Sequence, residues 1–250
     1  MSFLYRTFLR PAVFLQDSER AHSRVLSVLS SMSRTRFSLS MLGALYRSPD
    51  LPITVMNIDF PNPLGLAAGM DKNGEAVPSW QSIGYGFCEI GGVTLHEQPG
   101  NPKPRMFRAS KDKALINRMG FNNPGSEIMA ESLKIQMSKR WAGVPVGINL
   151  GKSKITPNEE AEKDYAGTME RLWDFADLFV VNVSSPNTPN LRELQSGSEL
   201  DRILTACKIV NKRKTEETGQ KAKPLLVCLL YTSDAADDMQ CVDLGGRRII

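Results

Sequence analysis

The sequence has few of the residues on which several common kinds of site depend. It contains two histidines, His22 and His96, and four cysteines without a Cys-x-x-Cys spacing. We therefore expect no Ser-His-Asp triad, no metal site and no disulfide framework, and a reducing compartment suits the free cysteines. The longest apolar runs are far shorter than the roughly 20 residues that a helix needs to cross a bilayer.

Positive charge is concentrated near the N-terminus. The net charge is +4. Residues 1–50 hold seven arginines but only three acidic residues, Asp17, Glu19 and Asp50, so the rest of the chain is close to neutral. We expect no nucleic-acid partner.

The same N-terminal segment predicts two short amphipathic helices, the first capped by Asp17 or Ser18. Arginines beside an apolar face suit a helix that lies in the headgroup region of an anionic membrane. The alternative is a helical pair that packs on the body of the protein. No secretory signal is indicated. The apolar residues at helical spacing are Ala21, Val25, Val28, Leu29 and Met32 in the first helix, and Met41, Leu42, Leu45 and Tyr46 in the second.

The rest of the chain alternates short apolar runs with longer helical patterns, which is typical of a parallel sheet with crossover helices. Near-continuous apolar strands indicate burial on both faces and favour a barrel or a doubly wound sheet. The five expected strands are 63–68, 87–90, 145–150, 178–183 and 225–230.

Small and polar residues follow four of these strands. Residues 182–192 bring amides and hydroxyls together directly after a buried strand, and we interpret this loop as the reaction centre. An ordinary Ser-Pro-Asn turn is the alternative. In a parallel barrel all strand ends of this kind lie on one rim, where ligands bind. The other three groups are 67–72, 91–94 and 149–152.

At this level of detail the sequence resembles the dihydroorotate dehydrogenases, and most closely their membrane-associated, quinone-reducing class. The matching motifs are 62–72, 89–94, 100–105, 116–123, 147–152 and 182–188. The resemblance implies an α/β fold, a (β/α)8 TIM barrel that holds FMN. It also implies oxidation of dihydroorotate to orotate in pyrimidine synthesis, with a quinone as the final electron acceptor.

The resemblance also supplies roles for individual residues. Ser185 is the expected base for the C5 proton of the substrate, although a serine hydroxyl needs help to act as a base and the sequence shows no obvious helper. A soluble class of the family has cysteine there. Arg108 matches an arginine of the quinone tunnel. Expected substrate contacts are Lys72, Asn117, Arg118, Met119, Gly120, Phe121, Asn182 and Asn187, and expected FMN contacts are Ala67, Ala68, Gly69, Gly91, Gly92, Thr94, Asn149 and Asn182.

Three segments are expected: a helical quinone-entry and membrane extension (1–50), a partial FMN barrel (51–227) and an atypical tail (228–250). The resemblance ends near Val227, where Cys228 replaces a flavin-contacting lysine and later barrel motifs are missing. We therefore expect a barrel truncated after about five strands and a non-native tail. The class implies a peripheral location on the cytoplasmic side of a bacterial inner membrane.

Two other functions remain open. The chain could be a non-catalytic fragment that binds a membrane or a partner through its N-terminal helices. It could also be a related flavin barrel that acts on a reduced pyrimidine with another electron acceptor.

Overall fold

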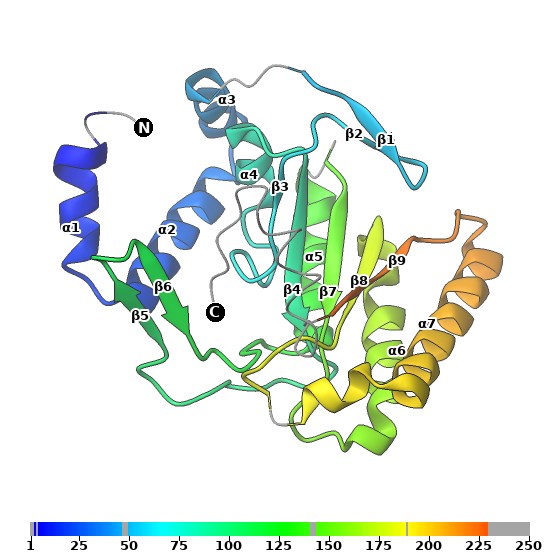
Figure 1. The fold of residues 1–250 in the computed structure, drawn as a ribbon. Coiled ribbons are helices and arrows are strands. Elements are labelled where there is room, and N and C mark those ends of the chain that lie inside the picture. The colour runs from blue at the N-terminus through cyan, green and yellow to red at the C-terminus, as the bar shows by residue number, and fades with distance from the viewer. Residues whose placement is uncertain (1–2, 4, 47–49, 141–143, 189, 230–250) are drawn as a thin grey trace.

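The computed structural model describes residues 3, 5–46, 50–140, 144–188 and 190–229 (Figure 1). Its largest sheet has five parallel strands in the order β3-β4-β7-β8-β9. All five predicted strands are present, with ends that differ by a few residues. They are β3 (Gly65–Leu66), β4 (Phe87–Val93), β7 (Val146–Leu150), β8 (Leu178–Asn182) and β9 (Leu225–Cys228).

A helix connects each strand of this sheet to the next, as parallel pairing requires. Figure 1 shows α5, α6 and α7 along one side of the sheet. In the described residues β3 and β9 each have one neighbouring strand in this sheet, so the sheet does not close into a barrel. The connecting helices are α4 (Val77–Ile83), α5 (Ser126–Arg140), α6 (Ala161–Leu172) and α7 (Gly197–Thr218).

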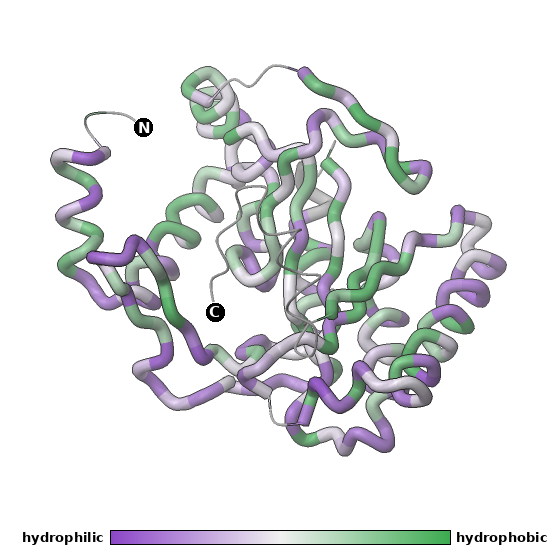
Figure 2. Tube along the Cα trace, in the orientation of Figure 1, coloured by the Kyte–Doolittle hydropathy of each residue, from purple (hydrophilic) through white to green (hydrophobic). Residues whose placement is uncertain are grey.

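The core lies between the sheet and these helices. Every residue of β7 is buried, and Figure 2 shows the strands as largely hydrophobic. On α6, Tyr165, Met169 and Leu172 are fully buried, as their helical spacing predicts. The helical spacing of these three residues and Ala176 in the sequence predicts one inner stripe, but Ala176 follows the 3-10 turn η3 (Trp173–Phe175), because the α-helix ends at Leu172. Each buried side chain of this size contributes about 2 kcal/mol.

A second apolar cluster lies on the face of the sheet opposite to these helices. Phe87, Leu178 and Val180 contact Phe60, whose ring meets Phe87 edge-on at 5.4 Å. Phe60 belongs to the hairpin of β1 (Ile53–Val55) and β2 (Ile58–Phe60), which the sequence did not predict. This cluster provides an apolar floor under the polar strand ends.

The two predicted N-terminal helices are α2 (Ser18–Met32) and α3 (Arg36–Leu45), preceded by η1 (Tyr5–Leu9) and α1 (Arg10–Phe14). Asp17 caps α2 and accepts a hydrogen bond from Arg20 N at 3.0 Å. Leu29 and Leu42 pack on the core, whereas Val28 and Met41 are exposed. One face of this pair therefore packs on the body of the protein and another stays free. Among the described residues no helix has the length and hydrophobicity of a membrane span.

A second hairpin, β5 (Met106–Ala109) and β6 (Ala114–Asn117), packs beside α2. It carries Arg108 and Asn117, two of the predicted site residues. The proposed tail, 228–250, lies outside the described residues except for Cys228 and Leu229, and the three predicted segment boundaries stay predictions.

Candidate active site

One cavity of about 1220 Å³ opens at the carboxyl ends of β3, β4, β7 and β8. Helices α1 and α2 and the β5–β6 hairpin form its opposite wall. The structure therefore brings together strand ends that are far apart in the sequence, as the parallel arrangement predicts. The predicted site residues that line the cavity are Ala68, Gly69, Lys72, Gly92, Arg108, Asn117, Met119, Gly120, Phe121, Asn149, Asn182, Ser185 and Asn187.

Four predicted site residues, Ala67, Gly91, Thr94 and Arg118, are not among the lining residues. Thr94 is fully buried, and its hydroxyl donates to His96 O at 2.6 Å. The Arg118 guanidinium donates to Pro104 O at 3.0 Å. In this structure these two side chains hold the neighbouring loops, and their predicted contacts with ligands stay predictions.

Glycine backbone forms the wall at the ends of β3 and β4. Gly69 N donates to Gly91 O at 2.9 Å, and Gly91 N donates to Lys72 O at 2.9 Å. Gly69 and Gly91 have φ angles of +94° and +106°, which strongly favour glycine. A Cβ at Gly91 would lie 2.4 Å from Asn149 O, whereas a Cβ at Gly69 would meet no atom within 4 Å. The Gly69 backbone therefore borders open space, where a flat ligand can approach.

A chain of side-chain hydrogen bonds crosses the ends of β4, β7 and β8. Asn149 Nδ2 donates to Glu89 Oε1 at 2.7 Å, and Asn182 Nδ2 donates to Asn149 Oδ1 at 3.0 Å. Asn182 Oδ1 in turn accepts from the backbone N and the hydroxyl of Ser184, at 3.0 and 2.8 Å. Tyr165 fixes the end of β8 from the core side by donating to Asn182 O at 2.8 Å.

Lys72 lines the same cavity as these amides, from the loop after β3. Its Nζ donates to Asn122 Oδ1 at 2.5 Å. Burial lowers the pKa of Lys72 to about 8, and the positive charge of Arg105 acts in the same direction. A half-buried ammonium of this kind suits an anionic ligand, whose charge would compensate for the lost hydration.

Asp71, beside Lys72, fixes the backbone of this loop. Its fully buried carboxylate accepts hydrogen bonds from Glu75 N at 2.7 Å, Ala76 N at 2.8 Å and Trp80 Nε1 at 3.1 Å. Burial raises the pKa of Asp71. Asp71 was not among the predicted site residues, because an acidic residue in a loop is usually solvated.

The loop after β6 reaches over the cavity and is held by polar contacts. Asn123 Nδ2 donates to Phe121 O at 2.6 Å and to Thr94 Oγ1 at 2.9 Å. Gln98 Nε2 donates to Gly120 O at 3.0 Å. Residues 119–121 therefore face the cavity on a loop that is tied to the end of β4.

Ser185 is half-buried and lines the cavity in the loop after β8. Its Oγ accepts a hydrogen bond from Asn187 N at 3.3 Å. A hydrogen-bond donor directed at this oxygen favours the deprotonated form of the hydroxyl. The Asn187 N–H therefore gives Ser185 modest assistance as a base, which the sequence did not predict.

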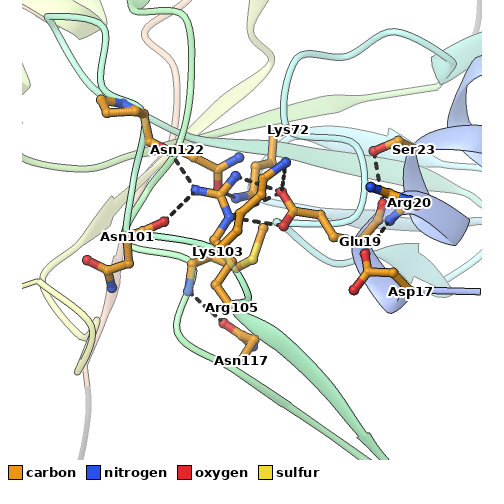
Figure 3. Close-up of polar contacts among 12 residues, drawn as sticks. Asp17, Glu19, Arg20, Ser23, Lys72, Asn101, Lys103, Arg105, Asn117 and Asn122 are labelled. Carbon is orange, nitrogen blue, oxygen red and sulfur yellow. Dashed lines mark hydrogen bonds and ion pairs between the residues drawn. The ribbon is translucent and has the colours of Figure 1, made fainter.

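Charged contacts join the N-terminal helices to the cavity wall, as Figure 3 shows. Arg105 donates to both oxygens of Glu19 on α2, at 2.6–3.2 Å, and Lys103 lies 3.4 Å from the same carboxylate. The hydrogen bond from Arg105 lowers the pKa of Glu19. Glu19 was not among the predicted site residues, although its partner Arg105 ends the quoted motif 100–105.

Arg108 lies on the same wall. It donates to Gln16 O at 2.6 Å and sits 4.9 Å from the centre of the Phe14 ring. His22, also missed, lines the cavity from α2, and burial followed by the charge of Lys72 lowers its pKa. This end of the cavity is more apolar than the strand ends, because Phe14, Val25 and Leu115 line it.

Comparison with known proteins agrees with this geometry. The sequence profile of the family described as "Dihydroorotate dehydrogenase" matches residues 50–244. A Gloeobacter violaceus protein named "Dihydroorotate dehydrogenase (quinone)" is 49% identical, over 98% of this chain and 66% of the relative. A Chloroflexus aurantiacus protein of the same name is 46% identical, over 100% of this chain and 70% of the relative.

Solved structures show the same likeness. The Eimeria tenella DHODH in complex with ferulenol has a TM-score of 0.75 and 32% identity, over 93% of this chain and 66% of that one. The ligand-free form from the same organism has a TM-score of 0.67 and 35% identity, over 82% and 65%. The chain thus spans about two thirds of the length of the proteins that it matches. On its sequence, its parallel sheet and the polar residues at its strand ends, the chain belongs to the dihydroorotate dehydrogenase family.

Proposed function

We propose that this protein oxidises dihydroorotate to orotate, with FMN as the hydride acceptor and a quinone as the final electron acceptor, in pyrimidine biosynthesis. One observation carries the proposal: Lys72 in the loop after β3, Asn182 at the end of β8 and Ser185 in the loop after β8 meet at one cavity beside glycine backbone. The names of the bacterial relatives support the substrate and the acceptor.

The residues at the strand ends fit the flat ring of a flavin. Ala68, Gly69 and Gly92 line the cavity with little or no side chain, and the amides of Asn149 and Asn182 lie beside them. Where the family commonly has Ser or Thr, this chain has Gly92, so a contact there would come from the backbone. A bound FMN supplies the acceptor for the hydride that leaves C6 of the substrate.

Lys72 and the amides would hold the substrate by its charge and its polar edge. The ammonium of Lys72 pairs with a carboxylate, and the side chains of Asn117 and Asn187 offer both donors and acceptors to a pyrimidine ring. These contacts orient the C5–H bond toward the loop after β8.

Ser185 would then take the proton from C5, while the C6–H electron pair leaves as a hydride and a C5=C6 double bond forms. As Ser185 takes this proton, its own hydroxyl proton would pass to water, so the hydroxyl is restored. The N–H of Asn187 stabilises the negative charge that Oγ carries while its own proton leaves.

The quinone would take up the two electrons and two protons that the oxidation releases, and an apolar acceptor needs a different opening from that of the polar substrate. The apolar end of the cavity, between α2 and β5–β6, suits the quinone, and Arg108 on β5 would meet its polar head.

The exposed apolar face of the N-terminal helices supports a peripheral position on the cytoplasmic side of a bacterial inner membrane. Phe8, Leu15, Phe37 and Leu45 are all exposed there, in a segment that is rich in arginine. Co-sedimentation with anionic vesicles tests this part. We expect binding that weakens when Phe37 and Leu45 are replaced by serine, and equal binding of both forms would contradict it.

The assay that tests the function uses the product of the complete gene, loaded with FMN. We expect dihydroorotate oxidation with a soluble quinone and little with NAD or fumarate. Preference for NAD or fumarate would favour a related flavin barrel, and a colourless protein that is inert with every acceptor would favour a non-catalytic binding protein.

A further inference from the structure

The carboxylate of Glu89 has no part in the function described so far, yet it begins the hydrogen-bond chain at the strand ends. Glu89 lies in β4 on the side of the apolar cluster around Phe87, and it accepts from Asn149 Nδ2 at 2.7 Å. A carboxylate accepts hydrogen bonds and donates none. It therefore selects one of the two orientations of the Asn149 amide, the one with nitrogen toward Glu89 and oxygen toward β8.

That choice is passed on to Asn182. Because Asn149 presents its oxygen, Asn182 must present Nδ2, which donates to Asn149 Oδ1 at 3.0 Å. Asn182 Oδ1 is then turned toward Ser184, where it accepts two hydrogen bonds, and the Ser184 backbone N–H favours the same orientation from the other side. Both of its lone-pair directions are used, so the remaining hydrogen-bonding capacity of Asn182 is the second hydrogen on Nδ2.

We propose that Glu89 is a positioning residue, which fixes the orientation of both amides so that Asn182 meets a bound ligand only as a hydrogen-bond donor. The ligand atom at Asn182 is then an acceptor, such as a carbonyl oxygen or an unprotonated ring nitrogen. Identifying the ligand as a flavin or pyrimidine rests on the proposed function, whereas the orientation of the amides does not.

The first test follows the side-chain amides directly. In protein labelled with 15N-asparagine, Glu89→Met keeps the length of the side chain but removes the acceptor. We expect the side-chain NH2 signals of both Asn149 and Asn182 to shift, although Asn182 lies two strands away. Glu89→Gln still offers a carbonyl oxygen and should leave both signals nearly in place. The matched control is Glu131→Met, at an exposed position on α5.

A double-mutant cycle separates transmission through Asn149 from a general loosening of the fold. Asn149→Leu alone should shift the side-chain NH2 signal of Asn182. The double variant, with Glu89→Met and Asn149→Leu together, should show no further shift of this signal. The proposal fails if Glu89→Met leaves Asn182 unchanged, or if it shifts Asn182 equally with and without Asn149. If Glu89→Met does not fold, the Asn149→Leu variant alone still tests the proposal. The proposal is then wrong if the side-chain NH2 signal of Asn182 does not shift in Asn149→Leu.

Orotate binding to the FMN-loaded protein gives an independent readout. We expect Glu89→Met to weaken orotate binding about 10-fold, because the Asn182 amide can then rotate and present its oxygen to an acceptor atom of the ligand. Glu89→Gln should weaken orotate binding less than about 3-fold. Equal losses in the two variants would contradict the inference. Failure of the unaltered protein to bind orotate would instead count against the proposed function, and the amide signals still test Glu89.

Discussion

At the scale of single residues, the sequence predicted where side chains at or shortly after the strand ends lie, whereas their contacts with ligands stay predictions. Lys72, Asn149 and Ser185 could be placed at one rim because parallel strands end together. Glu19 and Arg105 could not, since their contact joins residues 86 positions apart and depends on how α2 packs. Glu89 was also missed as a functional residue, although it begins the quoted motif 89–94, because the sequence does not show which side chain an acidic residue inside a strand contacts.

The lowered pKa of Lys72 makes ligand binding dependent on pH. Below about pH 8 the ammonium is charged and attracts orotate, and as the pH rises above this value the charge is lost. We expect the orotate Kd to rise above pH 8, by up to about tenfold per pH unit if only the charged form binds. Titration of the flavin spectrum with orotate from pH 6 to 10 measures this. Lys72→Gln should bind weakly with little pH dependence, and an equally steep rise in that variant would contradict the assignment.

Gly91 is expected to tolerate no side chain. An added Cβ would lie 2.4 Å from Asn149 O in a backbone with φ of +106°. Gly91→Ala should therefore destabilise the protein by about 2 kcal/mol or more and reduce the FMN content. The matched control is Gly43→Ala in α3, where the nearest atom to the new Cβ is 3.8 Å away and alanine favours the helix. Thermal unfolding of both variants checks this, and equal melting temperatures would contradict it.

At the scale of elements, the helical spacing of apolar residues predicted α2 and α6, and near-continuous apolar runs predicted the five parallel strands. The two hairpins were not predicted. The three residues of β1 are all exposed, and its turn at Met56 and Asn57 takes positive φ angles without a glycine to mark it. The β5–β6 hairpin matters more for function, since it forms the cavity wall opposite the strand ends together with α1 and α2.

The attachment of α2 to this wall should depend on pH through Glu19. Arg105 holds the pKa of Glu19 below its usual value near 4.5. A group with a lowered pKa stabilises the folded state above its unfolded pKa, and this stabilisation is lost as the pH falls through the folded pKa. We therefore expect the protection of α2 amides, measured by hydrogen–deuterium exchange and corrected for the intrinsic exchange rate at each pH, to decrease below about pH 4.5.

Glu19→Gln should show the faster exchange in α2 already at neutral pH, because the carboxylate is absent at every pH. Glu131→Gln, an exposed change on α5, should behave like the unaltered protein. The account of this contact is wrong if Glu19→Gln and Glu131→Gln give the same exchange in α2.

At the scale of the whole molecule, a parallel sheet places its polar strand ends above an apolar floor and opposite the N-terminal helices. One cavity thereby has a polar end, beside Lys72 and Ser185, and an apolar end beside Phe14. The sequence predicted the polar residues at the strand ends and the amphipathic N-terminal helices separately. It could not predict the shape of the cavity, which depends on the packing of α2 and the β5–β6 hairpin.

The most direct test of the proposed role of Ser185 compares the Ser185→Ala variant with the unaltered protein, both as FMN-loaded products of the complete gene. If Ser185 takes the C5 proton, kcat for dihydroorotate should fall by about 100-fold or more, while the orotate Kd changes by less than about 3-fold. Ser185→Cys, which restores a group that can accept a proton, should recover part of the rate. An unchanged kcat in Ser185→Ala would contradict the account.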